Sequence, residues 1–178
     1  MTPDEFIAVV SHELRGPVAA IGAASQVLEG CDPASDSGRE ARDVIARQSQ
    51  KLAIALADVE QLGRLVWQRG GSSETGVDFV ALLRKCQVEV ADGAGPVHIT
   101  IDAALVDEAL ERTRNEAPSS LHAGFEQAKE EAATVFTLEP VGGGFGVQFL
   151  RALLERSGAQ VRFEQSAKGR RVVARLAD

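Results

Sequence analysis

The sequence predicts an α+β protein, in which a hairpin of two long helices precedes a small α/β sandwich. In the stretches 3–29 and 39–68, apolar residues recur at intervals of three and four, the period of one helical face. The rest of the chain mixes shorter helical patterns with strand-like alternation. Between them, residues 69–76 are rich in Gly and Ser and have the composition of a linker. The predicted domains are therefore residues 1–68 and 77–178.

The first helix begins with favourable capping residues. Thr2 can accept a hydrogen bond from a free amide group of the first turn, and Pro3 fits that turn. The two acids that follow complement the helix dipole. The apolar face consists of residues three or four apart, namely Phe6, Val10, Leu14, Val18 and Ile21. Residues 30–38, which contain Gly, Pro, Asp and Ser, predict a connecting loop.

The second helix carries a regular apolar seam that resembles a coiled-coil repeat. Its members alternate spacings of three and four: Ile45, Gln48, Leu52, Ala55, Val59, Leu62 and Val66. Two long helices joined by a short loop form an antiparallel hairpin. One hairpin cannot bury the apolar faces of both helices, so we expect a homodimer built as a four-helix bundle. The alternative is that the second domain covers the apolar residues left exposed on the hairpin.

The region after residue 77 predicts helices and strands in alternation. The expected helices span residues 77–89, 103–116 and 146–157, and the expected strands 97–101, 135–138, 159–164 and 171–176. Residues 118–132 are ambiguous, with a helix favoured around 125–132. Helices followed by an antiparallel pair indicate a sandwich with helices on one face of a mixed sheet.

The amino-acid composition argues against some classes of binding partner. A net charge of −7 argues against nucleic acid and anionic membranes as partners. No apolar run approaches the roughly 20 residues needed to span a bilayer, and no secretory signal is recognisable. Cys31 and Cys86 are expected to be free thiols in a reducing cytosol. We therefore expect a cytoplasmic protein.

One histidine in the first helix has a distinctive setting. His12 lies between Val10 and Leu14, off the apolar face, and is expected to be exposed. A neutral imidazole, with an unperturbed pKa of about 6.5, is a competent nucleophile near neutral pH. Glu13 follows directly and is a candidate to accept a proton from the ring.

The run Ser11-His12-Glu13-Leu14-Arg15-x-Pro17 resembles the phosphoacceptor box of the two-component sensor histidine kinases. The resemblance implies that His12 carries a phosphoryl group, with Glu13 as base and Arg15 as charge stabiliser. It also implies dimerisation through the hairpin. Gly16 stands where many members of the family have Thr or Asn, which disfavours a phosphatase role.

The segment Gly142-Gly-Gly-Phe-Gly-Val147 resembles the second glycine box of the kinase ATP-binding domain. Glycines before a helix let backbone amides approach a phosphate, and the helix dipole favours the anion. The resemblance would place nucleotide contacts at Gly142, Gly144 and Gly146.

Two other parts of the family's nucleotide site are missing. The helix that should hold magnesium through asparagines corresponds to residues 102–117, and it offers Arg112 and Glu116 instead. An Asp-x-Gly-x-Gly box, whose Asp reads the adenine amine, does not occur between Ala117 and Gly142. We therefore expect that ATP binding is lost, that no cofactor is stably bound and that the chain itself provides no metal site.

An intact phosphoacceptor beside an eroded ATP domain resembles the dimeric histidine phosphotransferases of phosphorelays. The first hypothesis is that His12 passes a phosphoryl group between response-regulator receiver aspartates, with Mg²⁺ supplied by the receiver and a hybrid histidine kinase as a further candidate partner. The second is an ATP-dependent kinase that autophosphorylates His12. The third is a non-catalytic pseudokinase that binds and inhibits a kinase or a regulator.

Overall fold

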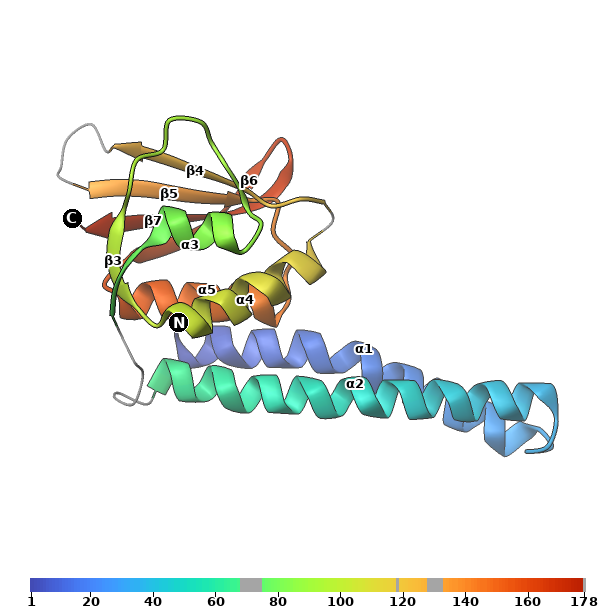
Figure 1. Ribbon diagram of the computed structural model, residues 1–178. Coiled ribbons are helices and arrows are strands. Elements are labelled where there is room, and N and C mark those ends of the chain that lie inside the picture. Colours follow the sequence, from blue (N-terminus) through green and yellow to red (C-terminus); the bar gives the residue numbers. More distant parts are fainter. Residues whose placement is uncertain (68–74, 118, 128–132, 178) are drawn as a thin grey trace. The chain divides into compact units, whose positions relative to one another are not determined.

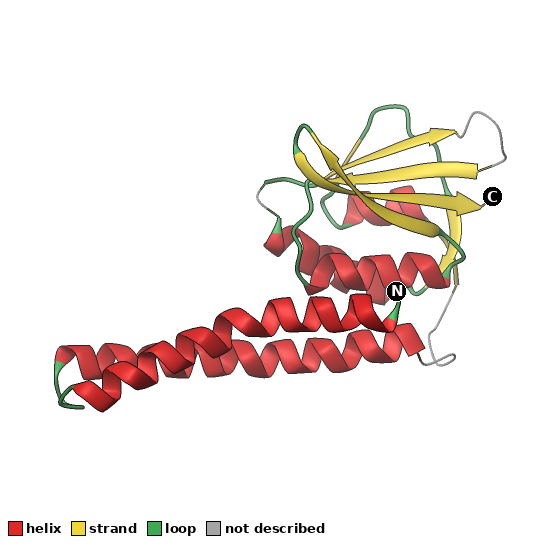
Figure 2. Cartoon of the chain, turned by 180° about the vertical axis from the view of Figure 1, so that it is seen from behind, coloured by secondary structure: helices red, strands yellow, loops and turns green. Residues whose placement is uncertain are grey.

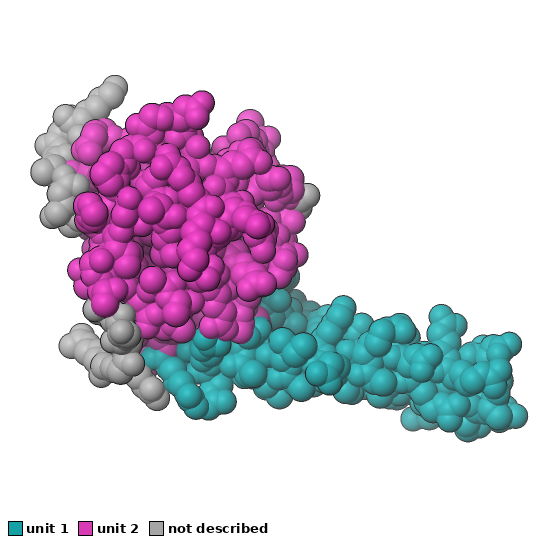
Figure 3. All heavy atoms as spheres, in the orientation of Figure 1, with its two compact units in different colours: residues 1–64 teal, residues 65–178 magenta. Residues whose placement is uncertain are grey.

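The computed structural model describes residues 1–67, 75–117, 119–127 and 133–177 (Figure 1). The chain divides into two compact units, residues 1–64 and 65–178 (Figure 3). The predicted linker, residues 69–76, falls mostly outside the described residues. Among the described residues, no helix combines the length and the apolar character that crossing a bilayer requires.

The hairpin consists of α1, Pro3–Gly30, and α2, Asp36–Trp67 (Figure 1). Thr2 caps α1 as predicted: its hydroxyl accepts the Glu5 N–H at 3.2 Å, and its own N–H donates to the Glu5 carboxylate at 2.7 Å. The helix continues through Pro17. The two long helices confirm the predicted hairpin.

The second helix begins three residues earlier than the sequence pattern indicated. The reason is Ser35, whose hydroxyl accepts the Gly38 N–H at 3.1 Å and so caps the first turn. Gly38 is required here by close approach, because a Cβ atom would lie 2.6 Å from the Asp32 carbonyl oxygen. Serine and glycine thus fold the turn back tightly.

The second unit is an α/β sandwich, as predicted. Its elements, in order, are β1 Thr75–Asp78, α3 Phe79–Lys85, β2 Glu89–Val90, β3 His98–Ile101, α4 Ala103–Glu116, β4 His122–Gln127, β5 Ala133–Glu139, α5 Phe145–Arg156, β6 Gln160–Ser166 and β7 Gly169–Ala177. The main sheet has the order β2-β4-β5-β7-β6, in which β2 is parallel to β4 and the other pairs are antiparallel. β1 and β3 form a separate antiparallel pair. Helices α3, α4 and α5 cover one face of the main sheet (Figure 2).

Two expectations for this unit are wrong in detail. The helix expected over residues 77–89 is shorter, because the Asp78 carboxylate accepts the N–H groups of Val80 and Ala81 at 3.0 and 3.3 Å and starts α3 at Phe79. The helix expected around 125–132 is not formed at residues 125–127, which belong to β4; residues 128–132 lie outside the described residues. Pairing with β5 along the whole of β4 overrides the local helical pattern.

The core of this unit holds its helices firmly against the sheet. Phe79 of α3 packs edge-on against Phe136 of β5, with ring centroids 5.1 Å apart. Helix α5 is buried on most of its surface, and Val147, Leu150 and Leu154 are fully inaccessible. The start of α5 is therefore a fixed point, and the glycine loop leads directly into it.

Candidate phosphoacceptor and glycine loop

His12 lies in the third turn of α1 and is exposed. Within the part of the chain that the structure describes, its ring forms no hydrogen bond or ion pair. Both ring nitrogens are therefore open to a partner. The long helix fixes the backbone beneath the ring, so that the position of the nucleophile is set by rigid secondary structure.

The two residues predicted to assist His12 have different positions on α1. Arg15 is exposed and lies three residues on, so it shares a side of the helix with His12. Glu13 is half-buried, and adjacent residues of a helix do not face each other. Neither side chain forms a hydrogen bond or ion pair with His12 among the described residues. The roles of Glu13 as base and Arg15 as charge stabiliser stay predictions.

The glycine loop joins β5 to α5 over a very short distance. Strand β5 ends at Glu139 and α5 begins at Phe145, so that only residues 140–144 connect them. The Val141 N–H donates to the Arg170 carbonyl at 2.8 Å and ties the loop to the start of β7. A connection of this length leaves no room for an inserted lid between the strand and the helix.

The end of α4 fills this loop. The Glu116 carboxylate accepts the Gly146 N–H at 3.1 Å, at the N-terminus of α5. A Cβ atom at Gly144 would lie 2.6–2.7 Å from the same carboxylate, and one at Gly142 would lie 2.9 Å from the Glu116 carbonyl oxygen. The positive end of the α5 dipole favours this carboxylate as it would favour a phosphate.

Helix α4 also packs against Gly146, the third residue at which a nucleotide contact was predicted. A Cβ atom at Gly146 would lie 2.4 Å from the Thr113 amide nitrogen, which cannot move without disturbing the helix. Thr113 itself is buried, and its hydroxyl donates to the Ala109 carbonyl at 2.7 Å. Close approach of the α4 backbone is thus a sufficient reason for glycine at positions 142 and 146, whereas Gly144 meets only the end of the Glu116 side chain.

The residues that replace the expected magnesium ligands are engaged elsewhere. Arg112 pairs with Glu108 at 2.7 Å, and its guanidinium lies 4.9 Å from the centre of the Phe149 ring. The Glu116 carboxylate is held by the Gly146 N–H. Across the described ranges, no group of three or more His, Cys, Asp and Glu residues is arranged to hold a metal ion.

The sequence pattern marked Glu116 only as the replacement of an asparagine and did not predict its contact with the loop. Thirty residues separate Glu116 from Gly146, and no spacing rule relates a helix end to a loop so far along the chain. The available signal was an acid at the end of one helix together with an uncapped glycine loop opening another.

Comparison with known families identifies the hairpin. Residues 4–66 match the family model of the His Kinase A (phospho-acceptor) domain. By this match, the hairpin is similar to a His Kinase A (phospho-acceptor) domain. A comparison with curated proteins gives no match.

Solved structures extend the likeness to the second unit. The histidine kinase AdeS of Acinetobacter baumannii aligns over 93% of this chain and 97% of its own, with a TM-score of 0.58 and 14% identity. The histidine kinase ThkA, solved in complex with the response regulator protein TrrA, aligns over 97% of this chain and 60% of its own, with a TM-score of 0.51 and 12% identity. At these identities the likeness shows the fold. The chain therefore has the fold of a histidine kinase core, in which a long helical hairpin precedes an ATPase-like α/β domain.

Proposed function

We propose that this protein is a histidine phosphotransfer protein that carries a phosphoryl group on His12 between receiver aspartates of response regulators. One contrast supports the proposal. The His Kinase A hairpin presents an exposed histidine, whereas the glycine loop of the second unit is filled by the protein's own Glu116. On this proposal, the chain combines an acceptor for phosphoryl groups in one unit with a closed nucleotide site in the other.

The proposed transfer is a displacement at phosphorus. A ring nitrogen of His12 attacks the phosphorus of a receiver phosphoaspartate. The N–P bond forms as the O–P bond breaks, and the aspartate carboxylate leaves with the electron pair. The ring then gives up the proton of its other nitrogen, for which Glu13 is the proposed acceptor. Arg15, on the same side of α1, would offset negative charge on the transferring group.

The second receiver reverses these steps. Its aspartate attacks phosphohistidine, and the imidazole leaves as the ring regains a proton. Magnesium would come with the receiver, whose acidic site supplies oxygen ligands. The solved complex of ThkA with a response regulator protein supports a receiver as the partner of this hairpin fold.

ATP does not fit the glycine loop in this arrangement. The Glu116 carboxylate lies against Gly144 and Gly146, where an incoming phosphate would meet both its volume and its negative charge. We therefore propose that the phosphoryl group does not come from ATP bound to this chain.

The hairpin also favours a second copy as partner. Ile7 and Val18 are 61% and 55% exposed and lie eleven residues apart, which is three helical turns and thus one face of α1. Leu56 of α2 is 53% exposed. We propose that two hairpins bury these side chains in a four-helix bundle, so that the working unit is a homodimer.

The alternative with specific support is an ATP-dependent histidine kinase that autophosphorylates His12, because the fold of the whole chain matches that of a histidine kinase. It requires Glu116 to leave the loop so that nucleotide contacts Gly142, Gly144 and Gly146. The remaining alternative, a non-catalytic protein that binds and inhibits a kinase or a regulator, needs no chemistry at His12.

Phosphoryl transfer with the purified full chain separates these functions. The protein is incubated with radiolabelled ATP and Mg²⁺, and separately with a panel of receiver domains phosphorylated beforehand, with His12→Ala as the control. Label that reaches His12 from a receiver but not from ATP supports the phosphotransfer protein. Label from ATP supports the kinase and contradicts the closed loop. Full activity of His12→Ala in cells would favour the binding protein.

A further inference from the structure

The outer edge of β4 is only partly paired. Strand β2 runs beside it for two residues, and the last main-chain bond on this side joins the Ala91 N–H to the Ala123 carbonyl at 2.9 Å. The chain then turns away at Asp92 and Gly93, whose φ of +82° suits glycine. Beyond Ala123, β4 continues to Gln127 without a neighbour on this side among the described strands.

Two residues of β4 direct main-chain groups to this open edge. In an antiparallel pair, alternate residues bond to opposite sides of the strand. Ala123 bonds outward to β2, so Phe125 and Gln127 face outward as well, while Gly124 and Glu126 bond to β5. The edge therefore offers two N–H and two C=O groups in the spacing that an added strand requires.

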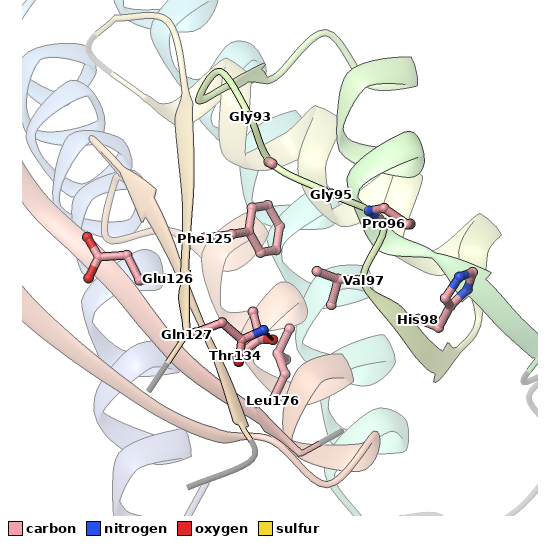
Figure 4. A pocket seen from close by; sticks show the side chains of 11 residues that line it. Gly93, Gly95, Pro96, Val97, His98, Phe125, Glu126, Gln127, Thr134 and Leu176 are labelled. Atoms are coloured by element: carbon pink, nitrogen blue, oxygen red, sulfur yellow. Dashed lines mark hydrogen bonds between the residues drawn. The ribbon is translucent and has the colours of Figure 1, made fainter. Parts of the chain in front are cut away.

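A pocket lies along the same edge. The loop of residues 93–97 and the end of β4 enclose a volume of about 450 Å³ (Figure 4). Val97, Phe125 and Leu176 contribute apolar surface to its lining, and His98, Gln127 and Thr134 contribute polar surface. Figure 4 shows the Phe125 ring projecting from β4 toward the loop, whereas Glu126 points to the other side of the strand.

The far wall of the pocket is held away from β4. The Val97 carbonyl accepts the Phe79 N–H at 2.8 Å, and the Val97 N–H donates to the Asp78 carboxylate at 3.4 Å. Farther along the loop, the Ala94 carbonyl accepts a bond from the Arg84 guanidinium at 3.5 Å. Because the loop bonds to α3 and its cap, its main chain does not complete the β4 edge.

We propose that this edge binds an extended segment of a partner protein, which pairs as an additional strand with Phe125 and Gln127 and inserts an apolar side chain into the pocket. Main-chain groups with no partner among the described residues favour a polypeptide, and the adjoining pocket favours insertion of an alternate side chain of that strand. Exposed Glu126, in a chain of net charge −7, favours a basic residue at the neighbouring position of the segment.

The test uses the full-length protein, labelled with ¹⁵N, and a capped octapeptide of alternating Lys and Val as the probe. Its counterpart with Glu in place of Lys is the charge control. Binding of the basic peptide should protect the amide protons of Phe125 and Gln127 from exchange. These two amides should exchange faster than those of Gly124 and Glu126 in the free protein.

Two substitutions at one position test the strand pairing. Gln127→Pro removes an N–H that faces the open edge, where proline is compatible with a strand, and Gln127→Ala keeps it. The proline variant should bind the basic peptide about tenfold more weakly, as expected when a strand hydrogen bond is lost, and the alanine variant should bind nearly as well as the unaltered protein. Glu126→Lys should reverse the preference between the two peptides.

Three results would overturn the proposal. The first is the absence of binding of either peptide at millimolar concentration. The second is binding that is unaffected by Gln127→Pro or that perturbs amides away from β4. The third is protection of Phe125 and Gln127 that rises with protein concentration alone, which would make the edge a contact between copies. A full set of unshifted core amides in each variant shows that the fold is retained.

Discussion

The hairpin and the second unit differ in how completely each buries its own apolar residues. Within residues 1–64, only Ala24, Ala41 and Leu62 are buried apolar side chains, and Ile7 and Val18 remain mostly exposed. The second unit has an extended core that runs from α3 through the sheet to α5. The same contrast holds for their chemistry, because the hairpin exposes His12 while the second unit has filled its glycine loop. The hairpin thus leaves apolar side chains exposed for a partner to cover, whereas the second unit buries most of its own.

The largest expected effect tests the exposed apolar face of the hairpin. Val18→Glu should raise the dimer dissociation constant by about a hundredfold or more, because each protomer would bring a charge into a buried apolar face. Sedimentation velocity over a range of concentrations measures the change. Gln26→Glu, at an exposed position of the same helix, is the matched control and should leave the dimer intact. A monomeric unaltered protein would show that something other than a second copy covers the stripe.

The next effect tests why the loop contains glycines. Gly146→Ala should destabilise the protein by about 1–3 kcal/mol, because the added methyl group meets the backbone of Thr113 and must force the helices apart. Gly143→Ala should cost much less, since a Cβ there meets only the end of the Arg170 side chain at 3.5 Å. Urea unfolding of both variants measures the difference. Equal stabilities would show that helix packing is not the reason for glycine at position 146.

A smaller effect is expected when the carboxylate in the loop loses its charge. Glu116→Gln should lower the free energy of unfolding by about 1 kcal/mol, because a charged acceptor at a helix N-terminus becomes a neutral one. Glu111→Gln, on an exposed part of the same helix, is the control. Binding of a fluorescent ATP analogue should be undetectable in the unaltered protein. Tight binding of the analogue would contradict the proposal that Glu116 closes the glycine loop.

A further prediction concerns a buried thiol of the second unit and needs no substitution. Burial, together with the hydrogen bond from Cys86 Sγ to Asp107 at 3.0 Å, raises the pKa of Cys86 from 9.0 to about 12. Its thiolate fraction at pH 8 should therefore be about a thousandfold lower than that of an ordinary cysteine, and iodoacetamide should modify Cys31 first. Peptide mapping by mass spectrometry distinguishes the two sites.

The same shift in the pKa of Cys86 has a consequence for stability. The unfolded thiol ionises near pH 9, whereas the folded thiol stays protonated to about pH 12. The unfolded state therefore gains stability as the pH rises above 9, and the contribution of this site to folding is lost between pH 9 and 12. Cys86→Ala should lessen that dependence in urea titrations at high pH.

The sequence contained enough information for the parts of the molecule that depend on local patterns. Helical periodicity located both long helices, and the residues around His12 were sufficient to predict that the hairpin resembles a His Kinase A domain. The sequence did not reveal β4 near Phe125, because strand pairing with β5 outweighs the local pattern there. It also missed Glu116 in the loop, since that contact depends on how α4 packs on α5. Interactions between distant segments are set by tertiary packing, which single-sequence patterns do not encode.

The carboxylate of Glu116 also changes how the loop would respond to anions in its surroundings. A free ligand competes according to its concentration, but a group on the same chain, held by a rigid helix, acts at an effective concentration of about millimolar or higher. Any phosphate-bearing molecule must first displace an occupant that cannot diffuse away. The loop should therefore respond far less to the concentration of free nucleotides and other phosphates than an open anion site would.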